Sequence, residues 1–574
     1  TDGRQYHHLW FGWACYQRRI SGTEWKPPIW FRFESIPEFW DWVESRTRAK
    51  TRLLMMCHNG GFDLPVLDAF NTLLARGYHL RSAVVDAPPI ILKWIKGSRT
   101  IQFIDTVNIW KMPLKKLGES IGVPKLTMPE QSAPDDEWDN YGKQDVEVIR
   151  RATLEYWAFL RDNDLGCFAP TIASQAFSTF RHRFMEHQIL IDDSDRAADI
   201  SRDSYVGGRC ECFRLGTYDG DIYYLDVNSM YPSVMINGQF PRKLRTVTKY
   251  CDIDDLKEWQ KDNALIADCI VETDEPAYPL KHEHKLIFPV GKFRVSLTGA
   301  ELKYALANDH VRRVIATCVY EQAPVFNAYI KYMYALRMDA RQRGDEVGES
   351  LAKLFLNTLY GKFGQRGRRY EIIDTTYDTS ILTWQHWDVP TQTLTNMRQF
   401  GGIIQEFVGE SESRHSFPAI ASFTTSYARM VLYRAIHKAG LENVLYCDTD
   451  SMVVNSAGLS RMQDELDANK LGAWKVEDKF KSVTLYGAKD YKFDAVKRTK
   501  GVRANATWIN DAEVEQDKFV GLRGMLREGS LNAPITERIH KILHREYNKG
   551  KVGSGGRVRP WVYSHNWARG NHIT

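Results

Sequence analysis

The sequence predicts a multidomain protein of mixed α/β and α+β class. Its 574 residues are too many for a single hydrophobic core, so several domains of ordinary size are expected. Apolar runs of strand length alternate with helical patterns, first over about residues 6–145 and again from about residue 216. Hydrophobic residues make up 43% of the chain and charged residues 26%, as is usual for globular proteins.

The composition excludes some classes of protein. No apolar run approaches the roughly 20 residues that a membrane-spanning helix needs, so no membrane insertion is expected. The nine cysteines are scattered, and the spacing of Cys210 and Cys212 fits neither a zinc knuckle nor a redox motif, which favours a reducing cytoplasm. The chain starts at Thr1 without a secretory leader, so we expect its numbering to begin inside a domain.

Basic residues are concentrated near the end of the chain. The formal net charge is only +5, but from Lys497 onward about 15 Lys and Arg residues stand against about 7 Asp and Glu residues. A polyanion such as a nucleic acid is therefore a plausible partner.

The two α/β regions each have recognisable strands. LLMMC at residues 53–57 and IQFID at residues 101–105 are predicted strands of one compact N-terminal domain. A second unit begins near residues 216–239, where the predicted strand YYLDV leads through a sharp turn into a predicted helix at NSMYPSVM. Its partner strand, in NVLYCDTDSMVV, comes only at residues 443–454, so this unit carries long insertions.

Between these strands, a helical stretch is predicted over about residues 327–360. It is flanked by two polar segments, near residues 242–323 and 366–417, that we predict to be irregular. The tail, residues 521–574, is predicted to contain a basic helix at residues 535–547 and a Gly-rich turn at residues 550–556. It is expected to form a small closing module.

Two sequences place carboxylates at the ends of apolar strands. They are DVNSMYPS, which begins at Asp226, and YCDTDS, which contains Asp448 and Asp450. Phosphoryl transfer requires divalent cations that activate the attacking hydroxyl and neutralise charge on the transferring oxygens, and paired aspartates can hold them. A lone Asp after a strand is more often a turn or helix cap, so the hypothesis depends on the two sequences occurring together.

A third pattern lies between them, in KLFLNTLYGKFG. Lys353, Asn357 and Tyr360 stand at i, i+4 and i+7, so one helix face presents an ammonium, an amide and a phenol. The alternative is a solvated amphipathic helix. Upstream, Arg337 and Arg341 lie one helical turn apart and either add charge to a phosphate site or form an exposed basic face.

In this order, DxxSxYPS, KxxxNxxYG and YxDTDS resemble motifs A, B and C of family B DNA polymerases. The resemblance implies a right-hand polymerase with palm, fingers and thumb that binds a DNA template-primer and dNTPs. It implies two Mg²⁺ ions, with Mn²⁺ as a possible substitute, held by Asp226, Val227 and Asp450, and it places Asp448 near the primer end. Lys353 would clamp the triphosphate, and Tyr231 would exclude a ribose 2′-hydroxyl. The implied nucleotide-binding residues are Val227, Asn228, Ser229, Met230, Tyr231, Arg337, Lys353, Asn357 and Tyr360.

Three shorter sequences resemble the protein-primed branch of that family, found in linear-genome phages, adenoviruses and linear plasmids. They are YVGG at residues 205–208, TSYAR at residues 425–429 and KDY at residues 489–491. By this resemblance the DNA-binding residues are Tyr205, Gly207, Gly208, Thr425, Arg429, Lys489 and Tyr491. The two polar segments fall where this branch carries its terminal regions, which implies a terminal protein primer as partner of a monomeric enzyme. The alternative for each segment is a generic surface insertion.

The N-terminal domain resembles a 3′–5′ exonuclease of RNase H-like fold. NGGFD, with Asn59 and Asp63, resembles the Exo II motif; YGKQD, with Tyr141 and Asp145, resembles Exo III; and Lys125 fits the accompanying Kx2h pattern. The resemblance implies a second metal pair at Asp63 and Asp145. The DxE pair of Exo I, expected on the first strand of this fold, is not found there in residues 1–574, so editing is expected only if that pair precedes Thr1 in a longer protein. Loss of editing is the alternative.

These inferences give expected domain boundaries and two rival functions. The expected ranges are 1–165 for an exonuclease-like domain with a truncated start, 166–240 for the first palm segment, 241–326 for insertion 1, 327–365 for the fingers, 366–417 for insertion 2, 418–520 for the second palm segment and 521–574 for the thumb. The expected location is the cytoplasm of a bacterial host or a viral replication site. The rivals are a primer-independent polymerase of a mobile element and a catalytically inactive DNA-binding scaffold.

Overall fold

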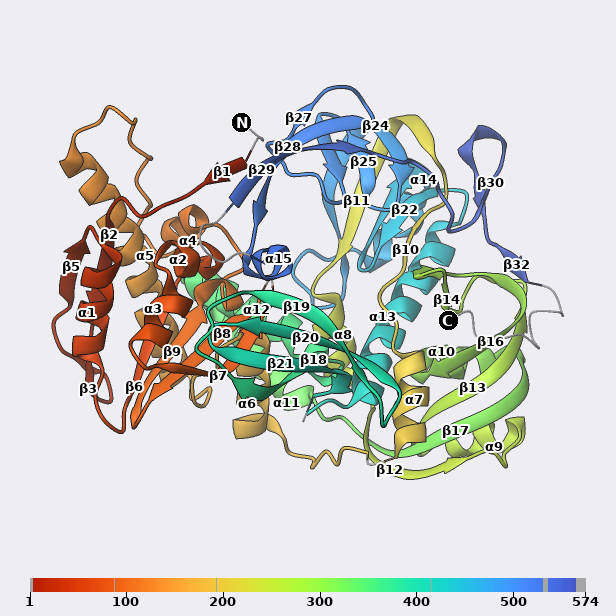
Figure 1. Ribbon diagram of the computed structural model, residues 1–574. Helices are drawn as coiled ribbons and strands as arrows, with labels where there is room; N and C mark the ends of the chain where they lie inside the picture. Colours follow the sequence, from red (N-terminus) through yellow and green to blue (C-terminus); the bar gives the residue numbers. More distant parts are fainter. Residues whose placement is uncertain (1–3, 87, 193, 414, 530–534, 564–574) are drawn as a thin grey trace.

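The computed structural model describes residues 4–86, 88–192, 194–413, 415–529 and 535–563, and Figure 1 shows their arrangement. The stretches of the expected thumb at 530–534 and 564–574 lie outside the described residues. No helix in the described ranges is both long enough and apolar enough to cross a membrane.

The N-terminal domain is built on a four-stranded sheet. Its strand order is β6 (Arg52–Cys57), β9 (Arg99–Asp105), β8 (Ile90–Lys96), β7 (His79–Val85), and the β6–β9 pair is parallel. The strands predicted at residues 53–57 and 101–105 are thus confirmed. The smaller ladders are β2 (Gly12–Tyr16) with β5 (Ile29–Phe33), and β3 (Arg19–Ser21) with β4 (Glu24–Trp25).

Five α-helices and one 3₁₀ turn belong to this domain. They are α1 (Ile36–Arg46), α2 (Gly60–Val66), α3 (Ala69–Ala75), η1 (Thr106–Asn108), α4 (Leu114–Ser120) and α5 (Asp135–Asp162). The longest, α5, begins with three acidic residues in its first turn, where the helix dipole favours negative charge. Its apolar residues, including the buried Val148 and Tyr156, face the core.

The second unit is a seven-stranded sheet. Its strand order is β10 (Cys210–Cys212), β22 (Val444–Asp448), β23 (Ser451–Asn455), β11 (Gly216–Val227), β24 (Trp474–Gly487), β25 (Asp490–Phe493), β26 (Val496–Thr499). As predicted, β11 leads through a sharp turn into α8 (Met230–Asn237), and its partner strand comes late in the chain. The helix α13 (Pro418–Ala439) packs against α8 and contributes Leu432 and Ile436 to the core beside the sheet.

Shorter elements connect these regions of the chain. They are α6 (Ile172–Thr179), the π-helix η2 (Phe180–Phe184), α7 (Asp195–Ser204), α14 (Ser456–Arg461) and η3 (Gln463–Glu465).

The helical stretch predicted over residues 327–360 is two packed helices. These are α11 (Asn327–Gln342) and α12 (Glu346–Phe363). Gly344, at a φ of 70°, provides the turn between them, and the Asp345 side chain caps α12 by accepting from the Gly348 N–H at 2.8 Å.

Insertion 1 (residues 241–326) was predicted to be irregular, and this prediction is wrong. The segment forms most of a five-stranded sheet of order β12 (Phe240–Thr248), β17 (Val311–Ala323), β13 (Asn263–Thr273), β16 (Val290–Thr298), β32 (Val562–Tyr563). It also holds the hairpin β14 (Leu280–His282) and β15 (Lys285–Ile287) and the helices α9 (Ile253–Trp259) and α10 (Gly299–Ala307). Asp268 interrupts the apolar run of β13 in the sequence, but in the fold it is buried and paired with Arg294 at 2.6 Å.

Insertion 2 (residues 366–417) is also an ordered sheet rather than an irregular segment. Its strand order is β18 (Arg366–Thr375), β21 (Ile403–Glu412), β20 (Thr393–Phe400), β19 (Leu382–Asp388). The hairpin turn at Gly401 and Gly402, with φ angles of 55° and 79°, lies against Phe70 and Leu74 of the N-terminal domain. Figure 1 shows this sheet beside that domain.

The basic segment at residues 535–547 begins as a strand and not as the predicted helix. β29 (Ile535–Ile542) pairs along its whole length with β28 (Glu513–Val520), in a sheet of order β1 (Arg4–Tyr6), β29, β28, β27 (Thr507–Trp508). Ile535, Ile539 and Ile542 have helical spacing, so periodicity alone predicts the wrong element. This sheet extends across the boundary expected between residues 520 and 521. The tail also contains α15 (Leu522–Glu528), β30 (Lys551–Val552), η4 (Ser554–Gly556) and β31 (Val558–Arg559).

One hydrophobic cluster joins three of these regions. Phe400 and Ile403 of insertion 2 and Leu522 of α15 are buried together with the N-terminal core residues Phe70 and Leu73. Distant segments of the chain therefore share one core, which fixes insertion 2 against the N-terminal domain.

We expect Phe400→Ala to loosen this junction. The buried Phe400 ring lies 5.9 Å from the ring of Phe70, and removing it should cost roughly 3–5 kcal/mol of local stability. Limited proteolysis should then cut insertion 2 faster than in the wild type. Val408→Ala, at a side chain that is 43% exposed on the same sheet, is the control and should leave the rate unchanged. Equal cleavage of both variants would contradict this role for Phe400.

Candidate functional site

The structure brings Asp226 and Asp450 to the same end of the seven-stranded sheet. Asp226 is the penultimate residue of β11, and Asp450 lies in the turn between β22 and β23. Antiparallel pairing of β11 with β23 sets Asp226 opposite Ser451. The Val227 N–H donates to the Asp450 carbonyl at 2.9 Å. Backbone pairing therefore makes the two carboxylate-bearing residues neighbours.

The two carboxylates are held in an unfavourable electrostatic state. Burial, with a contribution from the charge of Asp450, raises the pKa of Asp226 to about 6. Burial also raises the pKa of Asp450, with Asp448 adding to the effect. Lys475, 4.0 Å from Asp226, and the more distant Lys353 only partly oppose these shifts. A divalent cation between the carboxylates would relieve both the burial cost and the repulsion, so the pair fits a metal site.

Asp448 has different partners. Its carboxylate lies 3.3 Å from Lys489 Nζ and accepts from the hydroxyls of Tyr446 and Thr449 at 3.4 and 3.1 Å. Within the described ranges, no group of three or more His, Cys, Asp or Glu side chains is arranged to hold a metal ion. The candidate metal site of the sheet is thus the pair Asp226 and Asp450, with Asp448 beside it.

The turn after Asp226 is firmly fixed. Val227 and Met230 are buried, and Ser229 has a left-handed φ of 56° just before α8 begins. The Asn228 side chain donates to the Asp467 carbonyl at 2.8 Å. The Ser229 hydroxyl accepts from Arg337 Nη1 at 3.1 Å, which brings a guanidinium to this turn. The backbone here is thus held in a single conformation beside a cation.

Arg337 has a second partner, which the sequence reasoning missed. Its Nη2 lies 3.3 Å from the Glu349 carboxylate, one helical turn before Lys353 on α12. The i, i+4 spacing of Glu349 and Lys353 predicts a different pair, so no local pattern in the sequence pointed to Glu349 as the partner of Arg337. No ion pair of Arg341 is found among the described residues.

The face of α12 that was singled out in the sequence lies beside the carboxylates. Lys353 and Asn357 are exposed, and the charge of Lys353 acts on both Asp226 and Asp450. Tyr360 stacks on Tyr231 with ring centroids 4.3 Å apart. Three sequence segments therefore meet here, one from β11 and α8, one from α12 and one from the β22–β23 turn.

The YVGG segment packs directly on that turn. Tyr205 lies against Gly364, where an added Cβ would meet its ring at 2.5 Å. A Cβ on Gly208 would be 2.7 Å from the Thr449 side chain, so only glycine allows this close approach. Gly207 is exposed.

Thr425 and Arg429 were expected to contact DNA, but both are 2% exposed. Thr425 Oγ1 donates to the Ser422 carbonyl at 3.1 Å, and Arg429 forms an ion pair with Glu301. Their burial leaves no surface for a direct contact with DNA, so any effect on DNA must act through the residues they hold. In KDY, the Lys489 side chain is about half exposed beside Asp448, whereas Tyr491 is buried against Tyr446.

The N-terminal domain contains two further carboxylates whose pKa values are raised. Burial raises the pKa of Asp63 to about 6, with a smaller contribution from Asp105. Burial also raises the pKa of Asp145, against the opposing effect of its ion pair with Lys125. The ammonium of Lys125 lies 4.2 Å from the ring centre of Tyr141, so the Exo III and Kx2h residues do meet.

Asn59 and His58 lie at the start of α2. Asn59 is exposed, with a left-handed φ of 75° and its N–H donating to Asp105. His58 has hydrogen bonds at both ring nitrogens, to Thr106 Oγ1 and the Met112 carbonyl, which fix its ring.

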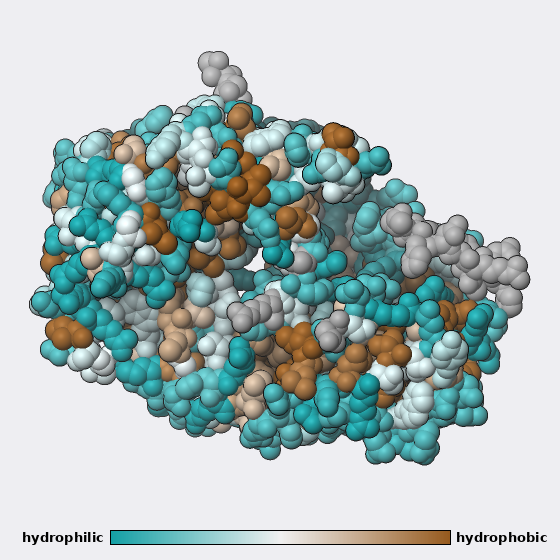
Figure 2. Space-filling view, turned by 60° about the horizontal axis from the view of Figure 1, so that its bottom comes forward, coloured by the Kyte–Doolittle hydropathy of each residue, from teal (hydrophilic) through white to brown (hydrophobic). Residues whose placement is uncertain are grey.

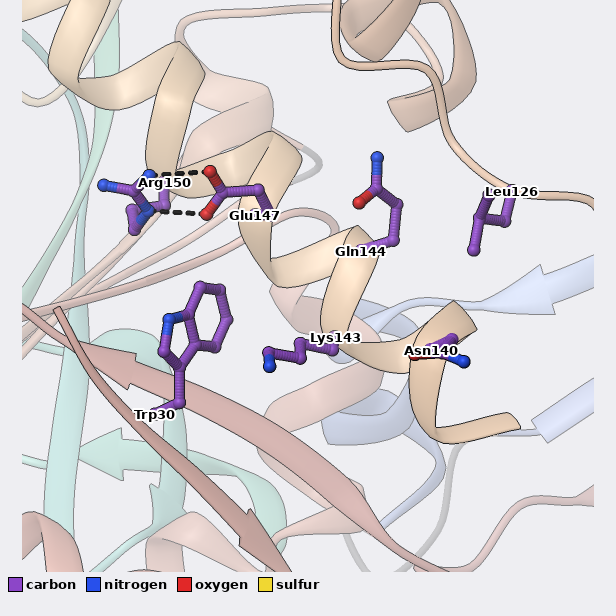
Figure 3. A pocket seen from close by; sticks show the side chains of 7 residues that line it. All are labelled: Trp30, Leu126, Asn140, Lys143, Gln144, Glu147 and Arg150. Atoms are coloured by element: carbon purple, nitrogen blue, oxygen red, sulfur yellow. Dashed lines mark hydrogen bonds and ion pairs between the residues drawn. The ribbon is translucent and has the colours of Figure 1, made fainter. Parts of the chain in front are cut away.

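A pocket of about 510 Å³, shown in Figure 3, lies beside α5. The ion pair of Arg150 with Glu147 closes one side of it. The residues that line it are Trp30, Leu126, Asn140, Lys143, Gln144, Glu147 and Arg150. It contains none of the carboxylates singled out above.

Comparison with known proteins points in the same direction as this geometry. Residues 128–437 match the family described as DNA polymerase type B, organellar and viral. The DNA-directed DNA polymerase of Enterobacteria phage PRD1 is 28% identical over 298 residues, 51% of this chain and 50% of that protein. A probable DNA polymerase of Neurospora intermedia is 25% identical over 56% of this chain and 34% of that protein. The chain thus spans half or less of these two relatives' lengths.

A solved structure resembles nearly the whole chain. Phi29 DNA polymerase complexed with primer-template DNA superposes with a TM-score of 0.66, covering 94% of this chain and 100% of that one. Because the sequences are 17% identical, this likeness shows a shared fold.

The raised pKa of Asp226 predicts how metal-free stability depends on pH. Since the folded state binds this proton more tightly than the unfolded state, stability falls as pH rises from about 4 to 6 and stays lowered above. Asp226→Asn should therefore raise the Tm of the metal-free protein at pH 7 by about 2 °C, and by less at pH 4. Asp478→Asn, at an exposed carboxylate on β24, is the control. A lower Tm for Asp226→Asn at pH 7 would contradict the cost assigned to burying the Asp226 carboxylate beside Asp450.

Proposed function

This chain belongs to the organellar and viral type B DNA polymerases, and on that premise we propose that it adds dNTPs to a DNA 3′ end by two-metal catalysis at Asp226 and Asp450. The observation that carries the proposal is the meeting of these two perturbed carboxylates with Lys353 at one end of a sheet. An inactive DNA-binding scaffold would have no need to hold carboxylates in a repulsive arrangement.

Each group at the site has a proposed role. Asp226 and Asp450, with the Val227 carbonyl, would hold Mg²⁺ or Mn²⁺, which when bound lowers the pKa of the attacking 3′-hydroxyl and neutralises charge on the triphosphate. Lys353 and Arg337 supply cations to the triphosphate, and the fixed backbone of residues 227–230 positions its oxygens. Asp448 with Lys489 would lie at the primer terminus.

Two aromatic rings would shape the nucleotide pocket. The stack of Tyr231 on Tyr360 makes a rigid wall, and exposed Asn357 stands one turn away from Tyr360 on α12. A rigid ring under the sugar leaves no room for a 2′-hydroxyl, which selects dNTPs over NTPs.

Template-primer DNA is the proposed partner, and a protein primer the proposed means of initiation. The phi29 polymerase, with the same fold, is described as bound to primer-template DNA. The face seen in Figure 2 is hollowed near its centre. The two insertions, each an ordered sheet, stand on either side of the α11–α12 pair in the sequence, where protein-primed relatives carry the regions that hold a terminal protein.

We propose 3′–5′ exonuclease editing by the N-terminal domain only on the condition that the protein also carries the Exo I DxE pair. Asp63 and Asp145 have the raised pKa values expected of metal-binding carboxylates, and Tyr141 and Lys125 lie beside Asp145. A 3′–5′ exonuclease would also need the Exo I DxE pair on its first strand, and residues 1–574 have no such pair at that position.

Asp450→Asn should abolish primer extension, by at least about a thousandfold, because an amide cannot replace a carboxylate ligand. Binding of template-primer DNA should change little, since phosphate contacts come from other residues. The measurement is extension of a labelled primer with Mg²⁺ and dNTPs, with DNA retention followed by gel shift. Asp478→Asn is the matched control and should extend normally. Near-normal extension by Asp450→Asn would overturn the proposed chemistry.

The mode of initiation has its own test. Purified protein is incubated with single-stranded template, Mg²⁺ and dNTPs, with and without an annealed primer. A protein-primed enzyme should elongate the annealed primer and make no product when both primer and terminal protein are left out. Product without either would instead assign the chain to the primer-independent polymerases.

A further inference from the structure

Two buried arginines connect insertion 1 to the turn that carries Asp448 and Asp450. Arg209 directly follows YVGG, and Arg429 lies on α13; each is 2% exposed. Neither side chain reaches solvent, so both act only through the protein groups they contact.

Arg429 uses its whole guanidinium to join three segments. Its Nε and Nη2 donate to the two carboxylate oxygens of Glu301, on α10 of insertion 1, at 2.7 and 2.8 Å. Its Nη1 donates to the carbonyls of Val206 and Gly207 at 2.8 and 2.9 Å. The Glu301 side chain is only 1% exposed, so the carboxylate has no solvent to compete for the arginine. Such a bidentate pair fixes the orientation of the guanidinium and hence of the two carbonyls.

Arg209 is held by insertion 1 from another direction. Its Nη1 donates to the Pro276 carbonyl at 2.8 Å, and its guanidinium lies 4.2 Å from the ring centre of Phe288. Glu211 neutralises its charge at 2.7 Å. The backbone carbonyl of Arg209 accepts from the Thr449 N–H at 2.6 Å.

The contacts of Arg429 and of Arg209 both lead to Thr449. It lies between Asp448 and Asp450 and has a left-handed φ of 62°, a conformation that a threonine adopts only when its surroundings impose it. Those surroundings are Gly208, which contacts its side chain, and the Arg209 carbonyl, which binds its N–H. Insertion 1 therefore reaches the metal-binding turn through the hydrogen bonds of two buried arginines and through the backbone of residues 206–209.

We propose that Glu301 is a positioning residue for the metal site, acting through Arg429 and the YVGG segment on the turn at Thr449. Insertion 1 thus sets the geometry of Asp450, and this role is separate from the binding of any partner. The inference rests on the proposed function, because it assumes that Asp226 and Asp450 take a cation. A small displacement of one ligand is enough to weaken a divalent metal site.

Two substitutions separate positioning from mere stability. Glu301→Gln keeps the shape but leaves Arg429 without its counter-charge. Asp268→Asn is the matched control, because Asp268 is a buried carboxylate of the same insertion, and its hydrogen-bonded partner is Arg294 and not Arg429 or Arg209. Both should lower Tm, but only Glu301→Gln should raise the half-saturating Mg²⁺ concentration for primer extension, by about fivefold or more. Glu301→Asp, which keeps the charge, should restore most of the Mg²⁺ affinity.

A second readout uses Mg²⁺ alone. Without DNA, Mg²⁺ should raise the Tm of the wild type and of Asp268→Asn, and Glu301→Gln should need about fivefold more Mg²⁺ for the same shift. If the wild type binds Mg²⁺ but does not extend primers, the proposed function fails and this readout still tests the positioning.

If Glu301→Gln needs no more Mg²⁺ than Asp268→Asn does, Glu301 has only a structural role and the proposal is overturned. If Glu301→Gln does not fold, Glu301→Asp decides: its carboxylate is one methylene shorter and should need about twofold more Mg²⁺. An unchanged requirement would overturn the proposal.

Discussion

The antiparallel pairing of β11 with β23 is the constraint on which the candidate site depends. It brings Asp226 and Asp450, far apart in the sequence, to neighbouring positions at one sheet end. Backbone hydrogen bonds and a buried apolar core on both sides of the sheet hold the strands, so the carboxylates cannot move apart to reduce their repulsion. Burial, with a smaller contribution from the charge of Asp450, raises the pKa of Asp226, and a carboxylate held at such a cost is typical of functional sites.

The surrounding segments add groups to this site or fix its position in different ways. The pair of helices α11 and α12 carries the cationic and aromatic groups over the carboxylates, and the stack of Tyr231 on Tyr360 couples the helices to the sheet. The insertions, which interrupt the sheet in sequence, do not interrupt it in space. Insertion 2 is fixed to the N-terminal core through Phe400 and Ile403, and insertion 1 is fixed to the metal-binding turn through Arg429 and Arg209.

The functional role of short polar sequences at strand ends could be predicted, because the chemistry of phosphoryl transfer requires particular residue types there. The turn after Asp226, the helix that follows and the helical character around Lys353 could all be predicted from the sequence. The sheets of the insertions could not, because charged residues such as the buried Asp268, which pairs with Arg294, stand in strands where an apolar pattern is expected. The strand at residues 535–542 was missed because its isoleucines fit a helical period, and only pairing with β28 decides its conformation.

Ion pairs between residues far apart in the sequence could not be predicted from the sequence either. The TSYAR sequence predicted that Arg429 contacts DNA, yet Arg429 is buried and forms an ion pair with Glu301. No local pattern in the sequence indicates Glu301 as its partner. Gly208 was expected to bind DNA, whereas the space that a side chain at this position would need is filled by Thr449 of the same chain.

The most direct test is a crystal structure of the protein with template-primer DNA, a non-reactive dNTP analogue and Mn²⁺, whose anomalous signal locates the metal. We predict an ion coordinated by carboxylate oxygens of both Asp226 and Asp450, at the nucleotide's phosphates. A nucleotide bound in place with no ion touching both carboxylates would rule out Asp226 and Asp450 as a shared metal site.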